Sequence, residues 1–193
     1  MAKPKKPRFK VARRLGENVF NHPKALKRGI QSRRKQSEYG KQLLEKQKLK
    51  EYYGLMERQF RRYMREAFRS EENPGVVLIQ KLERRLDNIV YRLGYGSTLR
   101  QSRQIVGHGH ILVNGKRTDI PSFVLEPGDE VSLSERLKNK EMFRNNFQSI
   151  PLTLGYLEKD TEALTGRLVK MPEIEEIPIN VDILSVVEFY SRG

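Results

Sequence analysis

Residues 86–118, LDNIVYRLGYGSTLRQSRQIVGHGHILVNGKRT, decide the fold, because the repeat of apolar residues changes within them. Up to Val106 the apolar residues recur at three- and four-residue steps, a spacing that is typical of helices. From His110 onward the period falls to two, and Asn114-Gly115 follows, a pair that readily takes the positive φ values of a type I′ turn. The segment therefore predicts two short helices followed by a β-hairpin.

Further helices are predicted on the N-terminal side of this segment. Ser37 is a candidate N-cap for the first of them, Gly94 is placed to end the third, and Ser97 can cap the fourth. In the second helix an apolar stripe lies largely opposite a row of arginines. The four predicted helices cover residues 37–49, 53–70, 76–93 and 98–106.

Short strands and two more helices are predicted downstream. The strands are expected over residues 130–133, 156–157 and 168–169. Residues 135–148 are expected to form a basic helix, and Asn180 is the candidate cap of a last helix. The buried side of that last helix is expected to consist of Val181, Leu184, Val186, Val187 and Tyr190.

The positive charge of the chain is concentrated near its N-terminal end. Residues 1–50 hold 17 Lys and Arg against 3 acids, whereas residues 51–193 hold 21 of each, and the net charge is +14. Such a local excess suits a polyanion with recurring phosphates, such as a nucleic acid. A basic tail that only improves solubility is the alternative. Residues 1–36, which show no sustained periodicity, are expected to form a basic arm.

Several classes of protein are excluded by what the sequence lacks. Without cysteine there are no disulfides and no thiolate metal sites. No apolar run approaches the ~18 residues of a membrane helix and no signal peptide is recognisable, so a soluble intracellular protein without a membrane partner is expected. A phosphate loop, a nucleophile pair and a serine elbow are all missing, which argues against an enzyme. His108 and His110 have no carboxylate cluster nearby, so RNA contact or turn structure is expected for them rather than metal binding.

Basic residues surround the junction between the predicted helices and the hairpin. Ser97 would begin a helix whose first backbone N–H groups are free for a phosphate. Arg100 and Arg103 are three residues apart, so they share one side of that helix and can fork onto phosphate oxygens. An ordinary solvated basic face is the alternative.

Several runs in the chain occur in the order found in one known family. Inside the central segment they are residues 82–94 (LERRLDNIVYRLG), 97–98, 103–106 (RQIV), 108–111 (HGHI), 113–116 (VNGK) and 120–122 (IPS). These runs resemble the RNA-binding domain of the family of small-subunit ribosomal protein S4. Outside that segment, the similar runs are residues 36–40 (QSEYG), 42–43, 45–48 (EKQK), 53–54, 57–63 (ERQFRRY) and 187–191 (VEFYS). The resemblance to full-length bacterial members thus covers roughly residues 36–193.

The resemblance implies an α+β fold with a helical domain made from both ends of the chain. That domain is expected over residues 37–80 and 180–193, with an inserted mixed helix and antiparallel-sheet RNA-binding domain over 81–179. Many bacterial members carry a four-cysteine zinc site in the N-terminal arm. This chain has no cysteine and cannot bind zinc in that way, so no cofactor is expected.

The resemblance also implies a function. The chain is expected to be a cytoplasmic structural constituent of the small ribosomal subunit, and not an enzyme. It should bind ribosomal RNA as a primary binder that nucleates assembly of the subunit body. Contact with the neighbouring ribosomal protein S5, a place at the messenger-RNA entrance and an influence on translational accuracy are implied as well.

Three groups of site residues follow from these arguments. The expected ribosomal RNA contacts are Lys41, Lys46, Arg58, Arg61, Arg62, Arg84, Arg85, Arg92, Ser97, Arg100, Arg103, His108 and Lys116. The resemblance places Arg33, Arg34 and Lys35 at the messenger-RNA entrance. Residues 157–193 are net acidic and are repelled by phosphate, so a contact with a neighbouring protein is expected at Glu175, Glu176, Val181 and Tyr190. A merely solvated acidic face is the alternative for this last group.

Two rival functions use the same RNA-binding domain. In RNA-modifying enzymes and tRNA ligases it is an accessory to a separate catalytic domain, for which 193 residues leave no room. A free RNA-binding factor would not explain the matching runs of the helical domain.

Overall fold

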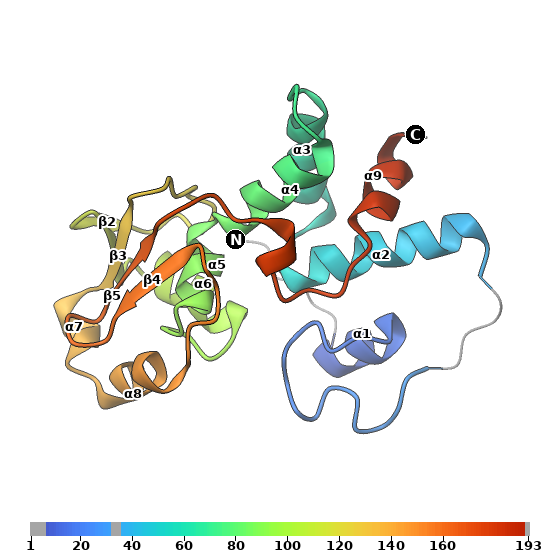
Figure 1. The fold of residues 1–193 in the computed structure, drawn as a ribbon. Coiled ribbons are helices and arrows are strands. Elements are labelled where there is room, and N and C mark those ends of the chain that lie inside the picture. The colour runs from blue at the N-terminus through green and yellow to red at the C-terminus, as the bar shows by residue number, and fades with distance from the viewer. Residues whose placement is uncertain (1–6, 32–35, 192–193) are drawn as a thin grey trace. The chain divides into compact units, whose positions relative to one another are not determined.

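The computed structural model describes residues 7–31 and 36–191. It divides into two compact units, which we call the first unit (residues 1–78 with 178–193) and the second unit (residues 79–177). Helices occur in both, and the second unit contains a five-stranded antiparallel sheet (Figure 1). The expected α+β fold class is therefore confirmed. Arg33, Arg34 and Lys35 lie outside the described residues.

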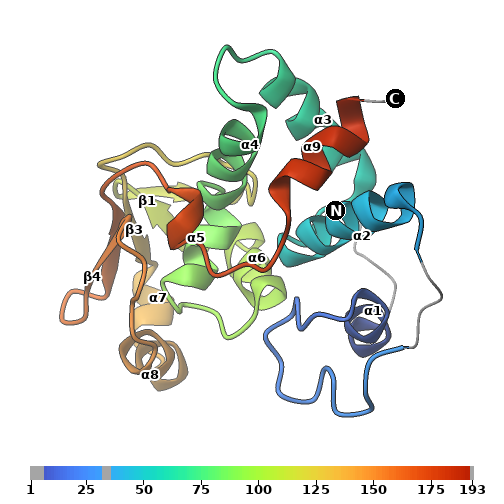
Figure 2. The same cartoon turned by 45° about the vertical axis from the view of Figure 1, so that its right-hand side comes forward.

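The first unit is helical. Its elements are α1 (Arg8–Leu15), α2 (Glu38–Tyr52), α3 (Glu57–Phe68), the start of α4 (Pro74–Glu83) and α9 (Ile183–Ser191). The N-cap predicted for α2 is present, because the Ser37 hydroxyl accepts a hydrogen bond from the Gly40 N–H at 3.2 Å. Although α9 follows α2 by 130 residues, the two helices lie side by side (Figure 2).

Helix α3 provides much of the core of this unit. Phe60, Tyr63, Met64 and Ala67 are buried at three- and four-residue steps, as the periodicity predicts. Arginines occupy the opposite side of the helix and are exposed. One face of α3 is therefore fixed by packing while the other is presented to solvent.

A partly buried polar cluster, which we call the Glu57 cluster, joins α9 to α2 and α3. Lys46 Nζ lies 2.9 Å from Glu57 Oε1 and 4.7 Å from the centre of the Phe189 ring. Tyr190 donates its hydroxyl hydrogen to Glu57 at 3.0 Å, and Gln42 donates to Glu188 at 2.8 Å. Three helices thus meet on one carboxylate.

Two expectations for the first unit are wrong, and one helix was not predicted. That helix is α1, which lies in the basic arm and buries Val11 and Leu15 against Leu44 and other residues. Helix α3 begins at Glu57 rather than near residue 53, because Gly54 takes a left-handed φ of +57° and ends the preceding helix.

The last helix also begins later than expected. Asp182, not Asn180, caps it, because its carboxylate accepts from the Ser185 N–H at 3.2 Å. With this start Leu184 faces solvent, 68% exposed, and Val186 is the residue of α9 that is fully buried.

The second unit places a sheet beside several short helices. The helices are the end of α4, then α5 (Leu86–Arg92), α6 (Leu99–Gly107), α7 (Glu135–Lys138), α8 (Glu141–Ser149) and a 3₁₀ turn (Ile174–Glu176). The strands are β1 (Ile111–Val113), β2 (Lys116–Thr118), β3 (Glu130–Leu133), β4 (Leu157–Asp160) and β5 (Thr165–Leu168). Their order across the sheet is β2-β1-β3-β5-β4, and every neighbouring pair is antiparallel.

The predicted hairpin is confirmed. Strands β1 and β2 pair with Val113 opposite Lys116, and the turn residues Asn114 and Gly115 have φ values of +50° and +76°. Positive φ at both central positions is the signature of a type I′ turn.

One face of the sheet is covered by the helical part of the unit. A Cβ added to Gly166 would come within 2.5 Å of the Leu93 side chain, so α5 packs directly on β5. The Tyr95 hydroxyl donates to the carbonyls of Val131 and Leu164, and its ring stacks on Phe147 of α8 at 4.5 Å. On the other face, the side chains of Glu158, Asp160 and Arg167 are exposed.

The predicted helix over residues 76–93 is two helices with a break at Arg84-Arg85. The cause is a distant segment: Leu86 donates its N–H to the Phe123 carbonyl at 2.8 Å, and Leu125 donates to the Arg84 carbonyl at 2.9 Å. These bonds replace the helical ones at the break.

Two other expectations for the second unit are also wrong. Thr98, not Ser97, caps α6, since its hydroxyl accepts from the Gln101 N–H at 3.2 Å. Residues 135–148 form two short helices rather than one.

The Glu57 cluster should make stability depend on pH. Burial raises the pKa of Glu57, but hydrogen bonds from Lys46, Lys50 and Tyr190 outweigh it and lower the pKa from 4.5 to about 2. A carboxyl group with a depressed pKa stabilises the fold above pH 4.5 and loses that contribution as the pH falls toward 2. We expect Glu57→Gln to lower the free energy of unfolding by about 1–2 kcal/mol at pH 7, allowing for partial exposure, and by far less near pH 2.

Urea unfolding at several pH values measures this difference. Glu71→Gln is the matched control, because Glu71 is an exposed acid in the turn after the same helix. An equal loss of stability for Glu57→Gln at pH 7 and near pH 2 would contradict the role assigned to the ionised carboxylate.

Candidate nucleic-acid interface

Helix α3 presents a row of arginines on its solvent face. Arg58, Arg61 and Arg62, all predicted as contacts, are exposed. Arg61 lies 3.7 Å from Glu57 and Arg62 lies 3.6 Å from Glu66, so these two are weakly paired. For Arg58 no acidic partner is found among the described residues. Weak pairing leaves most of this charge available to an external anion.

The two predicted lysines of α2 differ in accessibility. Lys41 is exposed and lies 3.1 Å from Glu38, in a surface pair of little strength. Lys46 is only 5% exposed and is held by Glu57 and the aromatic rings of α9. As arranged here, Lys46 joins helices, and Lys41 is the lysine of this pair that a ligand can reach.

Asp87 organises the junction between α5 and α6. Its side chain is 1% exposed, and it accepts hydrogen bonds from Arg85 at 3.0 and 2.8 Å and from Arg103 at 2.7 Å. Arg85 is itself buried, whereas Arg103 keeps 23% of its side chain exposed. Asp87 thus ties two helices together and holds one arginine at the surface in a fixed orientation.

A second buried carboxylate lies close by in the chain. Glu83 is inaccessible to solvent and accepts from Arg92 at 2.7 Å, from Asn88 at 2.6 Å and from the Tyr156 hydroxyl at 2.8 Å. Burial and the charge of Glu83 raise the pKa of Tyr156, which keeps that hydroxyl protonated. Arg92 retains little exposed surface and acts here as a link within the unit.

Arg84 is also partly enclosed. Its Nε donates to the Leu125 carbonyl at 2.7 Å, and its Nη2 is paired with Glu126. This arginine fastens the segment that interrupts the predicted helix.

Four predicted residues are exposed around α6 and the hairpin. The Ser97 hydroxyl and N–H both donate to the Gln101 side chain, at 2.7 and 2.8 Å. Arg100, His108 and Lys116 are exposed, and no ion pair for them occurs in the described part of the chain. These groups, with Arg103, are the donors that the second unit offers to a phosphate.

The residues expected to contact a neighbouring protein do not form one described site. Glu175 and Glu176 belong to the second unit, whereas Val181 and Tyr190 belong to the first. Glu175 is exposed, but Glu176 accepts from Lys170 at 2.8 Å. Tyr190 is bonded to Glu57, and Val181 is half-buried.

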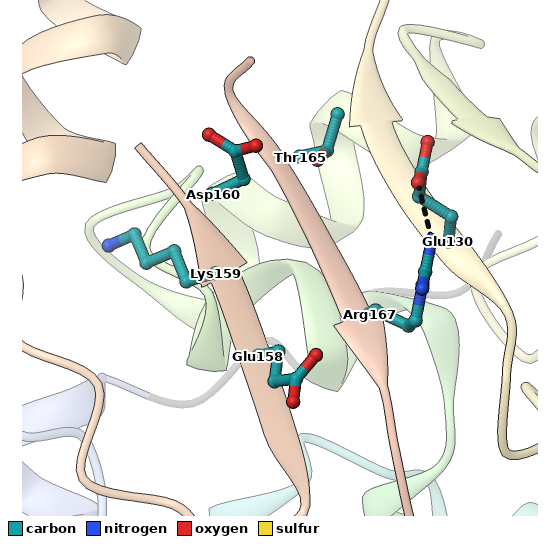
Figure 3. Close-up of a pocket in the computed structure, with 6 residues that line it drawn as sticks. All are labelled: Glu130, Glu158, Lys159, Asp160, Thr165 and Arg167. Carbon is teal, nitrogen blue, oxygen red and sulfur yellow. Dashed lines mark hydrogen bonds and ion pairs between the residues drawn. The ribbon is translucent and has the colours of Figure 1, made fainter. Parts of the chain in front are cut away.

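A shallow pocket on the open face of the sheet has the wrong charge for a phosphate. Its lining residues are Glu130, Glu158, Lys159, Asp160, Thr165 and Arg167 (Figure 3). Arg167 is already paired with Glu130 at 3.2 Å and lies opposite Glu158 on the next strand. Lys159 donates to the Ile150 carbonyl and lies over the Phe147 ring. The acids that remain repel a nucleic-acid backbone.

Residues 7–31 and 36–191 contain no group of three or more His, Asp or Glu side chains that could hold a metal ion. None of the helices in this part of the chain has the length and apolar character needed to cross a membrane.

Comparisons with known proteins account for nearly the whole chain. A model of the ribosomal protein S4/S9 N-terminal domain matches residues 3–83, and a model of the S4 domain matches residues 84–131. Small ribosomal subunit protein uS4B of Clostridium acetobutylicum is 54% identical over 187 residues, which is 97% of each chain. The chain belongs to the uS4 family.

Other relatives agree. Small ribosomal subunit protein uS4 of Finegoldia magna is 44% identical over the full length of both chains. The uS4 of Persephonella marina is 46% identical over 96% of this chain and 97% of its own. These relatives are structural ribosomal proteins and not enzymes, so the expectation of a non-enzyme is confirmed.

The uS4 match reaches further than the sequence motifs did. The motifs cover the chain from about residue 36, whereas the N-terminal domain model begins at residue 3. The segment with α1 is thus part of the uS4 pattern even without cysteines.

Arg65 and Arg69 were missed as candidate contacts of this uS4 chain. Both are exposed on α3, and no acidic partner for either is found within residues 7–31 and 36–191. Their positions, seven and eleven residues after Arg58, place all three on one side of the helix. The row was predicted from the helical period, although these two residues were not among the expected contacts.

Arg100 and Arg103 should differ in their effect on stability. We expect Arg100→Ala to change the free energy of unfolding by no more than about 0.5 kcal/mol, because the side chain is exposed. Arg103→Ala should cost about 1–3 kcal/mol, because the buried Asp87 loses one of its two charged partners. Urea unfolding of the two single variants tests this, and equal stabilities would show that Asp87 does not depend on Arg103.

Proposed function

We propose that this chain is a structural constituent of the small ribosomal subunit in the cytoplasm and binds ribosomal RNA through exposed basic faces on both of its units. The observation that carries the proposal is the 54% identity, over 97% of both chains, with a small ribosomal subunit protein. The match to an S4 domain over residues 84–131 supports RNA as the ligand.

The distribution of charge supports binding to phosphates rather than to bases. In the first unit the exposed donors are Arg58, Arg61, Arg62, Arg65 and Arg69. In the second they include Arg100, His108 and Lys116, and Arg103 is partly exposed. A-form RNA hides its base edges in a deep groove, so shape and phosphate contacts dominate recognition of its helices.

We further propose that the chain is a primary binder that nucleates assembly of the subunit body. The support is the family resemblance, together with a large number of exposed cations that need no other protein as a partner. A messenger-RNA contact at Arg33, Arg34 and Lys35 is part of the same proposal and rests on the resemblance alone.

Removing the arginine row of α3 should reduce the dependence of RNA binding on salt. The triple variant Arg58→Ala, Arg65→Ala, Arg69→Ala should bind small-subunit ribosomal RNA more weakly. The slope of log affinity against log salt should fall by about one for each phosphate contact removed. Filter binding at four salt concentrations measures both quantities.

The matched control is the triple variant with lysine at the same three positions. It keeps the charge, so its salt slope should stay close to that of the unaltered chain. A slope near zero for the unaltered chain would reject the electrostatic account.

Sedimentation separates the rival functions. A structural constituent should move with small subunits in equal molar amount after a wash at moderate salt. A free factor or an enzyme accessory would be found at low occupancy or on other particles.

We also propose that the acidic end of the second unit contacts a neighbouring protein, for which S5 is the candidate from the family resemblance. Glu175 is the better position to test, because it is exposed, whereas Glu176 accepts a hydrogen bond from Lys170. An interface between two ribosomal proteins can shift the balance between subunit states. Such a shift would alter translational accuracy.

Glu175→Lys should therefore change the frequency of misreading in a reporter assay while incorporation into subunits stays normal. Glu162→Lys is the control, since Glu162 is an exposed acid of the same unit outside the proposed interface. Equal misreading by the two variants and the unaltered chain would remove Glu175 from the interface.

A further inference from the structure

Cationic groups gather at one corner of the second unit, where the first hairpin meets α7 and α8. His108 and His110 lie in the turn after α6, Arg117 in β2, Arg136 in α7 and Lys140 directly before α8. We call these five residues the His110 cluster. The charges of the other four all act on His110, so the groups lie close together although they come from separate elements.

Backbone contacts fix the position of His110. Its carbonyl accepts a hydrogen bond from the Ser134 N–H at 2.9 Å, which joins the turn after α6 to the start of α7. The rings of His108 and His110 are 6.2 Å apart. The corner is therefore built from ordered backbone rather than from long side chains alone.

Gly109 allows Arg117 to lie across the same turn. A Cβ added there would overlap the Arg117 guanidinium, and Gly109 has a φ of +67° that favours glycine. The Nη2 of Arg117 reaches only the His108 carbonyl, at 3.5 Å. The guanidinium is thus held near the histidines while most of its donors stay free.

The charge of this corner is not neutralised from within. Three other cations of the unit have acidic partners: Arg167 has Glu130, Lys138 has Glu135 and Lys170 has Glu173. For the members of the His110 cluster, no ion pair is found in the described part of the chain. Like charges held close together repel one another, so the free corner is electrostatically unfavourable.

An orphan donor lies in the same corner. The Ser134 hydroxyl is buried and makes no hydrogen bond, and it does not cap α7. A buried hydroxyl without a partner costs free energy that an acceptor would recover.

We propose that the His110 cluster binds a phosphate group of the RNA backbone and that His110 takes up one proton from solvent when it does so. The proposal rests on the proposed ribosomal RNA binding and adds a site to it, since Arg117, Arg136 and Lys140 were not among the expected contacts. A phosphate accepts hydrogen bonds from several directions, which suits donors that arrive from four elements.

The uptake of a proton by His110 is expected from the charges that surround its ring. Burial, followed by the charges of Arg136, His108, Arg117 and Lys140, lowers the pKa of His110 below 6.5, so the ring is neutral at pH 7. A bound phosphate adds a negative charge that opposes the contribution of the four neighbouring cationic groups and so raises the pKa of His110. The neutral ring then becomes an imidazolium that donates from both nitrogens.

The expected result is tighter RNA binding at lower pH. One proton taken up on binding raises the affinity by at most about tenfold for each pH unit, in the range between the pKa of the free and of the bound state. Binding of the full chain to a small-subunit ribosomal RNA transcript should be measured from pH 5.5 to 8 at constant ionic strength. Titration of the histidine ring protons by NMR, with and without the RNA, reports the pKa of His110 directly.

Two variants test the cationic contacts and the proton uptake separately. Arg136→Ala with Lys140→Ala should weaken binding several-fold and lower the salt slope by about one to two, if both cations reach the phosphate. His110→Gln should remove most of the pH dependence. Arg167→Ala is the control, because this arginine is exposed on the same sheet but paired with Glu130, and its binding should equal that of the unaltered chain.

Failure of this inference is distinct from failure of the proposed function. Normal RNA binding with unchanged affinity, salt slope and pH dependence in both variants would overturn the phosphate site alone. An unaltered chain that does not bind ribosomal RNA would overturn the proposed function itself. A pKa of His110 that does not rise in the complex would reject the proton uptake.

Discussion

The second unit depends on a carboxylate that is buried between two guanidinium groups. Asp87 is 1% exposed and is held by Arg85 and Arg103, which come from the start of α5 and from α6. A buried carboxylate without partners would be costly in this position, so the burial of Asp87 depends on its two arginine partners. Glu83, with Arg92, Asn88 and Tyr156, repeats the arrangement and ties α4, α5 and the strand region together. The junction between α5 and α6 is therefore held together by ion pairs and hydrogen bonds that are largely enclosed within the unit.

Arginines have two different roles in this structure. Arg85 and Arg92 are enclosed and link helices, whereas Arg58, Arg65 and Arg100 are exposed. In the first unit, Lys46 is likewise enclosed and joins α2 to α3 and α9. A high count of basic residues thus overstates the charge available to RNA. The surface charge is set by which cations have an acidic partner nearby.

The sequence predicted correctly those features that depend on residues close together in the chain. The Asn114-Gly115 turn, the apolar stripe of α3 and the Ser37 cap each depend on residues a few positions apart. The break at Arg84-Arg85 could not be predicted in this way, because residues 123–125 supply the hydrogen bonds that replace the helical ones. The burial of Lys46 depends in part on Phe189 and Tyr190, more than 140 residues away. Helix α1 was missed because it has only eight residues, three of them buried, and so short a stretch does not show a clear helical period. Sequence patterns thus located the basic segments well, but they could not show which cations are enclosed by contacts with distant parts of the chain.

The discontinuous first unit has a consequence for folding during synthesis. Helix α9 follows the whole of the second unit in the chain, yet it packs beside α2 and shares the Glu57 cluster. The second unit is continuous, so its core can close as soon as residues 79–177 have been made. Until α9 is made, Phe60 and its neighbours on α3 lack part of their cover, and α2 lacks its partner. The ribosome that makes this chain therefore exposes a half-finished helical unit for the time needed to add roughly a hundred residues, about 5–20 seconds at ordinary rates of synthesis. During that interval the arginine face of α3 is already present, and its mutual repulsion opposes aggregation of the uncovered apolar stripe.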